Sequence, residues 1–192
     1  MVDACRSAGE YARGIASVGA DITEAEIAEM HEAGVRGVRF NFVKRLVDDT
    51  PRDLFISIAD KIKSFGWHVV VYFEAQDLED LESFLKKLPT TIVVDHMGRP
   101  DVAKGVNHAD FQRFVRLMSQ NENVWSKVTC PERLSLQGPP YDDVVPFYAE
   151  IVRRFSDRVL WGTDWPHPNM KSHMPDDGFL VDYIPRIAPT SE

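Results

Sequence analysis

The stretch TPRDLFISIADKIKSFGWHVVVYF, residues 50–73, joins a helix pattern directly to a strand pattern. Thr50 stands at the expected N-cap, and Pro51 falls in the first helical turn, where its missing N–H is not needed. Gly66 marks the end of the helix, and the apolar, β-branched run from His68 to Phe73 predicts a buried strand. The apolar helix positions recur with helical spacing on one face: Leu54, Phe55, Ile58, Ile62 and Phe65.

The same alternation of strand and helix continues along the whole chain. Strands are expected at Arg13–Val18, Gly37–Asn41, His68–Phe73, Thr91–His96, Asn123–Val128 and Arg158–Thr163. Helices are expected at residues 23–34, 50–66, 77–88, 109–119 and 142–155, the first with Thr23 and Glu26 at capping-box spacing. Regular alternation of this kind predicts parallel strands joined by right-handed crossovers.

The spacing between strands favours a TIM (β/α)8 barrel. Each strand-plus-helix repeat takes about 30 residues, as expected when about 250 residues are divided among eight units. A doubly wound parallel sheet is the alternative, since six strands are enough for it. The barrel is favoured because polar residues follow the strands, at the ends that converge on the mouth of a barrel. These residues are Arg39, Asn41, Tyr72, Glu74, Asp95, His96, Lys127, Thr129, Thr163 and Asp164.

Composition excludes several classes of function. The chain has 192 residues, 44% of them hydrophobic, and 22 Lys and Arg against 30 Asp and Glu give a net charge of −8. An acidic chain without basic clusters does not predict nucleic-acid binding. No apolar run reaches the length of a membrane span and the first residues do not resemble a signal peptide, so a cytoplasmic location is expected. Cys5 and Cys130 are too few for a disulfide framework and are expected to be small buried residues.

Two segments carry the residues best suited to catalysis. In IVVDHMGRPD, residues 92–101, His96 follows an apolar strand and could polarise a carbonyl or bind a metal. Its alternative role is a structural hydrogen bond at the strand end. In WGTDWPHPN, residues 161–169, Asp164 is held in a partly apolar setting that favours general-base chemistry. The alternative for Asp164 is a cap within a loop.

The positions of the arginines predict an anionic substrate. Arg39 and Arg45 lie at or after the end of one expected strand, and Arg133 follows another in the segment CPERLS. Guanidinium groups bind carboxylates through paired hydrogen bonds, so several of them at one mouth suit a substrate with more than one carboxylate. A surface ion pair is the alternative for any one of these arginines.

Together with GVRGVRFN, residues 34–41, these segments resemble the amidohydrolase superfamily, and within it the branch of dicarboxylate and sugar lactonases. The resemblance implies a hydrolase that opens a lactone such as 2-pyrone-4,6-dicarboxylate, in aromatic catabolism. It makes Asp164 the residue that activates water and places His96 near the scissile carbonyl. The implied substrate-binding residues are Arg39, Arg45, Tyr72, Arg133 and His167.

The sequence also departs from the family pattern, since it lacks the His-x-His pair of the first strand. Aligned with the family, the chain is expected to form one barrel domain over residues 1–192, about six of eight units, without the first two strands and the closing helix. A zinc site needs about three protein ligands, and His96 and Asp164 supply only two. The expectation is therefore no metal and no cofactor, with a small anionic substrate and a possible homo-oligomer. A sugar-lactone hydrolase, a metal-dependent decarboxylase and an inactive fragment remain alternatives.

Overall fold

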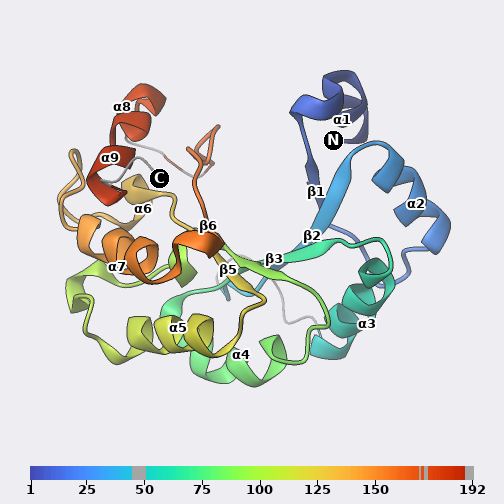
Figure 1. The fold of residues 1–192 in the computed structure, drawn as a ribbon, viewed down its shortest axis with the longest axis horizontal. Helices are drawn as coiled ribbons and strands as arrows, with labels where there is room; N and C mark the ends of the chain where they lie inside the picture. Colours follow the sequence, from blue (N-terminus) through green and yellow to red (C-terminus); the bar gives the residue numbers. More distant parts are fainter. Residues whose placement is uncertain (45–50, 169, 171–172, 189–192) are drawn as a thin grey trace. The chain divides into compact units, whose positions relative to one another are not determined.

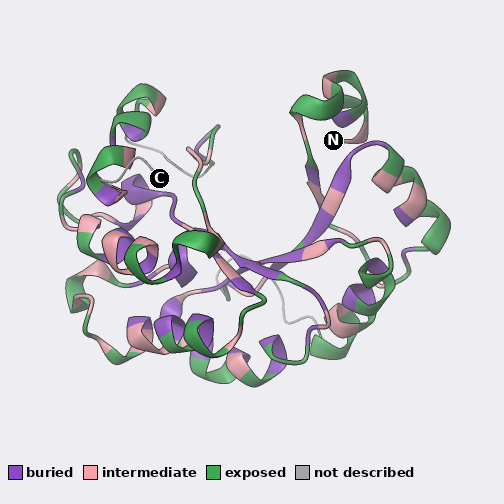
Figure 2. Cartoon of the chain, in the orientation of Figure 1, coloured by how far each residue is buried: buried purple, intermediate pink, exposed green. Residues whose placement is uncertain are grey.

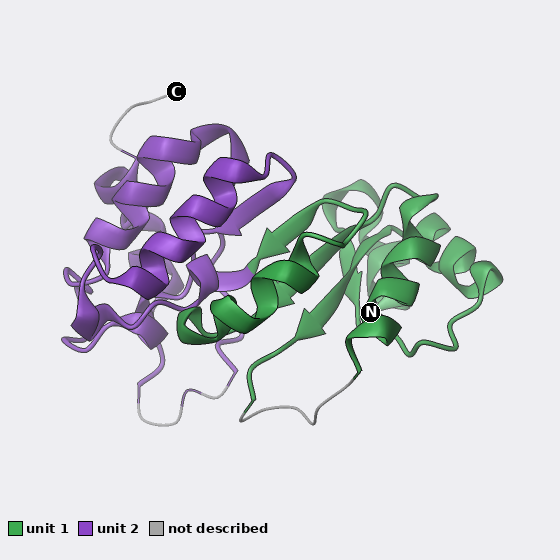
Figure 3. Cartoon of the chain, turned by 90° about the horizontal axis from the view of Figure 1, so that it is seen from below, with its two compact units in different colours: residues 1–94 green, residues 95–192 purple. Residues whose placement is uncertain are grey.

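A computed structural model describes residues 1–44, 51–168, 170 and 173–188. The chain divides into two compact units, Met1–Val94 and Asp95–Glu192 (Figure 3). Strands and helices alternate along both units, as the sequence predicts (Figure 1). Within the described residues, no helix is long and apolar enough to cross a membrane.

The first unit is built on four parallel strands. They are β1 (Gly14–Ala16), β2 (Val35–Asn41), β3 (His68–Tyr72) and β4 (Ile92–Val94), and each pairs with the next. The helices are α1 (Val2–Ala8), α2 (Glu24–Glu32), α3 (Arg52–Lys63) and α4 (Leu78–Leu85), with short 3-10 turns η1 (Gly9–Tyr11) and η2 (Ala75–Asp77). Helix α2 packs on β2, and α3 packs on β3.

Local capping rules explain where two of these helices begin. The Thr23 side chain accepts a hydrogen bond from the Glu26 backbone N–H, and the Glu26 carboxylate accepts one from Thr23 N–H, which confirms the capping box. Thr50 lies outside the described residues. Helix α3 starts at Arg52, so Pro51 occupies the N-cap position, and its expected place in the first turn is wrong by one residue.

The core of the first unit lies between the strands and the helix faces turned toward them (Figure 2). Residues Val69 to Tyr72 of β3 are all buried, as expected for a parallel strand covered on both faces. Gly37 of β2 allows close approach, because a Cβ there would lie 2.6 Å from the His68 carbonyl oxygen. Phe55 of α3 packs against Phe40 and Phe42, with ring centroids 4.5 and 5.1 Å apart.

The second unit has one parallel strand pair, β5 (Val124–Lys127) and β6 (Val159–Leu160). Its helices are α5 (Ala109–Gln120), α6 (Pro131–Leu134), α7 (Val145–Phe155), α8 (Asp177–Asp182) and α9 (Ile184–Ile187). The 3-10 segments are η3 (Asp95–Gly98), η4 (Val102–Lys104) and η5 (Ser156–Arg158). Helix α5 packs on β5 and α7 on β6, and Phe111 meets Phe147 at 4.9 Å between ring centroids.

Buried tyrosines fix the segment that follows β5. The Tyr148 hydroxyl donates to the Thr129 carbonyl oxygen at 2.6 Å, and the Tyr183 hydroxyl donates to the Tyr141 carbonyl oxygen at 2.8 Å. Burial raises the pKa of Tyr148 well above its ordinary value, so this hydroxyl keeps its proton and remains a donor. Buried tyrosine side chains therefore anchor the backbone at Thr129, just before α6, and at Tyr141.

Each expected strand overlaps an observed strand. Only β2 ends where expected, and it begins at Val35, two residues before its expected start; the other five strands end one to three residues earlier than expected. Strand β4 stops at Val94 instead of His96, and β6 stops at Leu160 instead of Thr163. His96 cannot belong to a strand because its φ of 51° lies in the left-handed region. The polar residues after β4 and β6 therefore lie in turns, and the backbone of these turns sets the direction of their side chains.

Candidate active site

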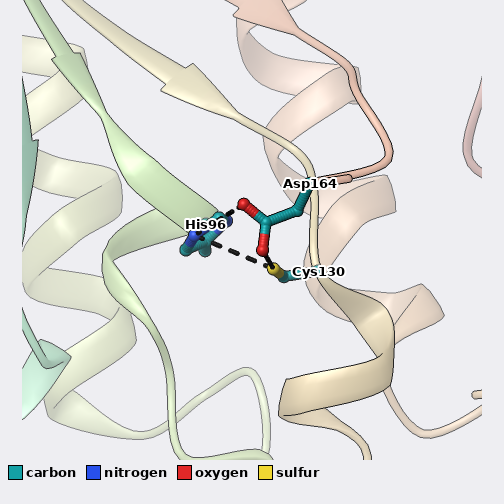
Figure 4. Close-up of side chains that lie close together, drawn as sticks. All are labelled: His96, Cys130 and Asp164. Atoms are coloured by element: carbon teal, nitrogen blue, oxygen red, sulfur yellow. Dashed lines mark hydrogen bonds and ion pairs between the residues drawn. The ribbon is translucent and has the colours of Figure 1, made fainter. Parts of the chain in front are cut away.

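Three turns of the second unit bring His96, Cys130 and Asp164 together (Figure 4). His96 lies in η3, Cys130 directly precedes α6, and Asp164 follows β6. Asp164 Oδ1 is 4.0 Å from His96 Nε2, and the Cys130 thiol donates to Asp164 Oδ2 at 3.1 Å. The sulfur also lies 3.7 Å from His96 Nε2. The predicted base and the predicted carbonyl-polarising histidine are thus neighbours.

All three residues have left-handed backbone conformations. Their φ angles are 51° for His96, 67° for Cys130 and 62° for Asp164. Non-glycine residues adopt this region at a cost of about 1–2 kcal/mol each, so the surrounding structure must compensate. Such strain clusters at functional sites because it aims side chains that regular structure would direct elsewhere.

His96 is buried and electrically neutral at pH 7. Desolvation lowers its pKa to about 4, with Arg133 and Lys127 acting in the same direction and Asp95 and Asp164 opposing them. Its Nδ1 lies 2.6 Å from the Thr129 hydroxyl, a contact within the interior. A neutral ring carries one N–H. The Thr129 contact at Nδ1 therefore determines whether the proton lies on Nδ1 or on Nε2, the nitrogen that faces Asp164.

Asp164 is paired with Arg133, whose side chain is only 13% exposed. The Arg133 Nη2 atom lies 2.6 Å from Asp164 Oδ2, yet its N–H does not point along a hydrogen bond. Both Nη2 and Nε of this guanidinium are buried without a hydrogen-bond partner among the described residues. Sequence reasoning considered the burial of Asp164 alone and did not anticipate the guanidinium beside its carboxylate.

Cys130 is the site residue that sequence reasoning missed. Its expected burial is confirmed, but it touches both His96 and Asp164 and does more than fill space. Burial raises the pKa of its thiol well above the ordinary value, and the Glu132 and Asp164 carboxylates raise it further. The group is therefore a thiol donor, not a thiolate nucleophile. The sequence signal that could have identified Cys130 as a site residue is its position shortly after a strand and three residues before Arg133.

His167 lies between two carboxylates of the second unit. Its Nδ1 is 3.4 Å from Glu132 Oε1, and its Nε2 is 3.2 Å from Asp177 Oδ1. Its backbone N–H donates to the Asp164 carbonyl oxygen at 2.8 Å, so it also closes the turn that carries Asp164. Burial raises the pKa of Glu132, a residue that sequence reasoning did not single out.

Two further predicted residues belong to the first unit. The Arg39 guanidinium lies 5.1 Å from the centre of the Tyr72 ring, at cation–π distance. The register pairs Asn41 of β2 with Tyr72 of β3, so Arg39 and Tyr72 lie on the same face of this strand pair. Arg45 lies outside the described residues.

The cluster also has to be tested as a metal site. One ligand atom each from His96, Cys130 and Asp164 lie within 4.8 Å of one another, so Cys130 supplies the third ligand that the sequence-based count lacked. One observation opposes a bound dication: the positive charge of Arg133 lies 2.6 Å from the same carboxylate. The residues do not fit a catalytic divalent cation.

Comparison with solved structures defines the fold class. A protein from Pseudomonas putida, described as a 2-pyrone-4,6-dicarboxylic acid hydrolase, superposes with a TM-score of 0.83 at 28% identity, over 99% of this chain and 70% of its own. A similarly described protein from Acinetobacter baumannii, crystallised with citric acid, gives 0.81 at 25% identity, over 99% of this chain and 71% of its own. The chain has the amidohydrolase-type TIM-barrel fold in incomplete form, with six strands in the described residues as the sequence predicts, and the doubly wound alternative is excluded.

The chain belongs to the amidohydrolase family, whose sequence profile matches residues 1–192. It is 62% identical over 200 aligned residues to a 2-pyrone-4,6-dicarboxylate hydrolase of Comamonas testosteroni, covering 100% of this chain and 66% of that protein. It is 35% identical over 191 residues to a 4-sulfomuconolactone hydrolase of Rhizobium radiobacter, covering 98% of this chain and 64% of that protein. The chain therefore spans just under two thirds of the length of these relatives.

Proposed function

We propose that the protein hydrolyses a lactone carrying carboxylate groups, of the 2-pyrone-4,6-dicarboxylate type. The observation that carries this proposal is a carboxylate, Asp164, set between a neutral imidazole at 4.0 Å and a buried guanidinium at 2.6 Å. A base, a neutral hydrogen-bond donor and an anion-binding group are the parts that hydrolysis of an anionic ester requires. The names of the two curated relatives, both hydrolases of anionic lactones, support it.

Asp164 acts as the general base in this proposal. Its Oδ2 is occupied by the Cys130 thiol and Arg133, whereas Oδ1 faces His96 Nε2 across 4.0 Å. Oδ1 is therefore the oxygen that takes a proton from water, and the hydroxide attacks the lactone carbonyl. The ester C–O bond then breaks, and the proton held by Asp164 passes to the oxygen that leaves.

His96 stabilises the negative charge that develops on the carbonyl oxygen. With a pKa of about 4 the ring is neutral at pH 7, so it acts as a hydrogen-bond donor and not as an acid. When the Thr129 hydroxyl donates to Nδ1, the ring proton stays on Nε2, the nitrogen nearer to Asp164. A fixed donor of this kind costs no reorganisation during the reaction.

The arginines select the anionic substrate. Arg133 is buried and lacks partners for two donors among the described residues, which suits a carboxylate ligand. Arg39, Arg45 and Tyr72 are proposed as further carboxylate contacts because they lie at or after the carboxyl ends of strands, and His167 as a neighbour of the site. The citric acid in the Acinetobacter baumannii relative supports a site for polycarboxylates.

We further propose that the reaction is metal-independent and cytoplasmic, and that residues 1–192 form a single barrel domain. The guanidinium beside Asp164 supports the first point, since a dication would be repelled there. A sugar lactone is the second candidate substrate, favoured by a 26% identical D-galactarolactone isomerase of Agrobacterium fabrum.

The test is an assay of the full-length protein with 2-pyrone-4,6-dicarboxylate, following the loss of ultraviolet absorbance as the ring opens. We expect turnover by the wild type and by the surface variant R153Q, because Arg153 is exposed and pairs with Glu150 of its own helix α7. The variant D164N is expected to bind the substrate without turning it over. Turnover of an aldonolactone in place of the dicarboxylate would move the substrate to the sugar class, and near-normal turnover by D164N would refute the assignment of the base.

A further inference from the structure

His167 is the buried anchor of the turn that carries Asp164. Among residues 162–168, all of which the structure describes, only His167 is buried, and its neighbours Pro166 and Pro168 are exposed. The backbone N–H of His167 donates to the Asp164 carbonyl oxygen at 2.8 Å, which closes the turn. The His167 side chain therefore connects this turn to the interior of the second unit.

The turn begins and ends with a strained residue. The φ angles of 62° at Asp164 and 56° at His167 both lie in the left-handed region. Residues other than glycine adopt this region at a cost, so contacts outside the turn must hold them there. The contacts of these two side chains therefore determine where the Asp164 carboxylate lies.

Helix α6 and its N-cap residue contact both ends of this turn. At the first end, the Cys130 thiol donates to Asp164 Oδ2 at 3.1 Å, and Arg133 Nη2 lies 2.6 Å from the same oxygen. Glu132 contacts the other end, because its Oε1 lies 3.4 Å from His167 Nδ1. The Glu132–His167 contact thus completes the attachment of the turn to α6.

The contact between Glu132 and His167 is shielded from water. The exposed fractions of the two side chains are 0% and 2%. His167 Nδ1 and both carboxylate oxygens of Glu132 are buried without a hydrogen-bond partner among the described residues, so removal of either side chain leaves the other buried and alone. Asp177 lies 3.2 Å from the other ring nitrogen, but its side chain is 43% exposed and its contact is the weaker one.

We propose that Glu132 and His167 are positioning residues, which hold the turn of Asp164 against α6 and so keep its carboxylate in place beside His96. This inference rests on the proposed function, in which Asp164 is the base. Neither residue acts on the substrate in this role, since both ring nitrogens of His167 face carboxylates of the protein. A displaced base slows the reaction more than it weakens binding, so loss of the contact should lower kcat and leave KM nearly unchanged.

The first experiment measures turnover of 2-pyrone-4,6-dicarboxylate by variants of the full-length protein. E132A should lower kcat about tenfold and change KM by less than about twofold, whereas E132Q, which keeps a polar group beside His167, should stay near the wild type. D157N is the control, because the Asp157 side chain is 78% exposed, and it should match the wild type. An unchanged kcat in E132A, or an equal loss in E132Q, would overturn the proposal.

Variants of His167 test which ring nitrogen matters. The amide of Asn takes the position of Nδ1 and the longer Gln places its amide near that of Nε2, so H167N keeps the contact with Glu132 and H167Q gives it up. H167N should retain most of kcat, and H167Q should lose about tenfold. The double variant E132A/H167Q should also lose about tenfold, since the two residues act as one unit. A loss of about a hundredfold would show independent effects and contradict the proposal.

Calorimetric titration separates positioning from folding. Isophthalate, a ring with two carboxylates and no lactone, serves as an unreactive probe. Protein with a displaced base still binds the probe, whereas unfolded protein lowers the number of binding sites. E132A and H167Q should therefore keep the stoichiometry of the wild type and its Kd within about twofold. A stoichiometry that falls in proportion to kcat would refute a positioning role.

Hydrogen exchange of the His167 backbone amide, followed by NMR, examines the turn without any substrate. This N–H is bonded to the Asp164 carbonyl oxygen, so its exchange rate reports opening of the turn. The rate should rise about tenfold in E132A and stay at the wild-type value in E132Q and D157N. If the wild type opens no lactone while E132A shows this rise, the anchoring of the turn stands and the lactonase assignment fails. If the wild type opens the lactone while E132A changes neither exchange nor kcat, the lactonase assignment stands and this inference fails.

Discussion

His96 Nδ1 and the Thr129 hydroxyl lie 2.6 Å apart in the interior of the second unit, and this contact fixes the ring beside Asp164. The variant T129V removes the hydroxyl and keeps the branched shape of the side chain. Loss of a buried hydrogen bond of this kind costs about 1–3 kcal/mol, so we expect kcat to fall about tenfold with little change in KM. T129S, which retains the hydroxyl, should stay near the wild type in the same steady-state assay. A loss in T129S equal to that in T129V would point to packing as the cause.

Protonation of His96 should make stability depend on pH. Its folded pKa of about 4 lies below the ordinary histidine value near 6.5, so the unfolded chain binds the proton more readily. This group therefore lowers the stability progressively as the pH falls from about 6.5 toward 4, by about 2 kcal/mol between pH 6.5 and 5. Urea unfolding of the wild type and H96Q at pH 7 and 5 measures the effect. The difference between the two proteins should shift in favour of H96Q at pH 5, and a constant difference would exclude this titration.

Glu132 should have the opposite dependence on pH. Burial raises the pKa of its carboxyl group, so the folded protein binds this proton more readily than the unfolded chain does. Its contribution to stability is present below the ordinary glutamate pKa and is lost as the pH rises through the folded value. The variant E132Q, which cannot ionise, should therefore gain stability relative to the wild type as the pH increases. Denaturant titrations across this pH range test the sign, and a loss that grows with pH would show that the ionised carboxylate is the stabilising form.

Cys130 should act through its proton and not as a nucleophile. C130S keeps a donor to Asp164 Oδ2, whereas C130A removes it, so C130S should retain most of kcat and C130A should lose about tenfold. Cys5, a buried cysteine of α1 in the first unit, provides the matched control, and C5A should leave kcat unchanged. Mass spectrometry of rapidly quenched reactions should find no substrate attached to Cys130. An adduct there would identify the thiol as the nucleophile.

Sequence reasoning predicted the alternation and singled out His96 and Asp164, the pair proposed as catalytic, because both follow from local rules. The Thr23–Glu26 capping box depends on four consecutive residues, and the polar residues after each strand follow from the order of elements. It missed Cys130 because the contact with Asp164 joins residues 34 positions apart. It also placed His96 inside a strand, since a left-handed backbone at a non-glycine residue is imposed by tertiary packing and leaves no local signature.

The full-length protein should work without a divalent metal. His96, Cys130 and Asp164 could supply three ligand atoms, but the Arg133 guanidinium lies 2.6 Å from the same carboxylate and would repel a cation placed there. Dialysis against a chelator should leave turnover of 2-pyrone-4,6-dicarboxylate unchanged, and elemental analysis of the purified protein should find zinc and manganese well below one equivalent. The variant R133Q sharpens the test, because removal of the opposing charge should increase zinc affinity measured by titration. Stoichiometric zinc in the wild type, with activity lost on chelation and restored by the metal, would contradict the metal-free mechanism and favour the decarboxylase alternative.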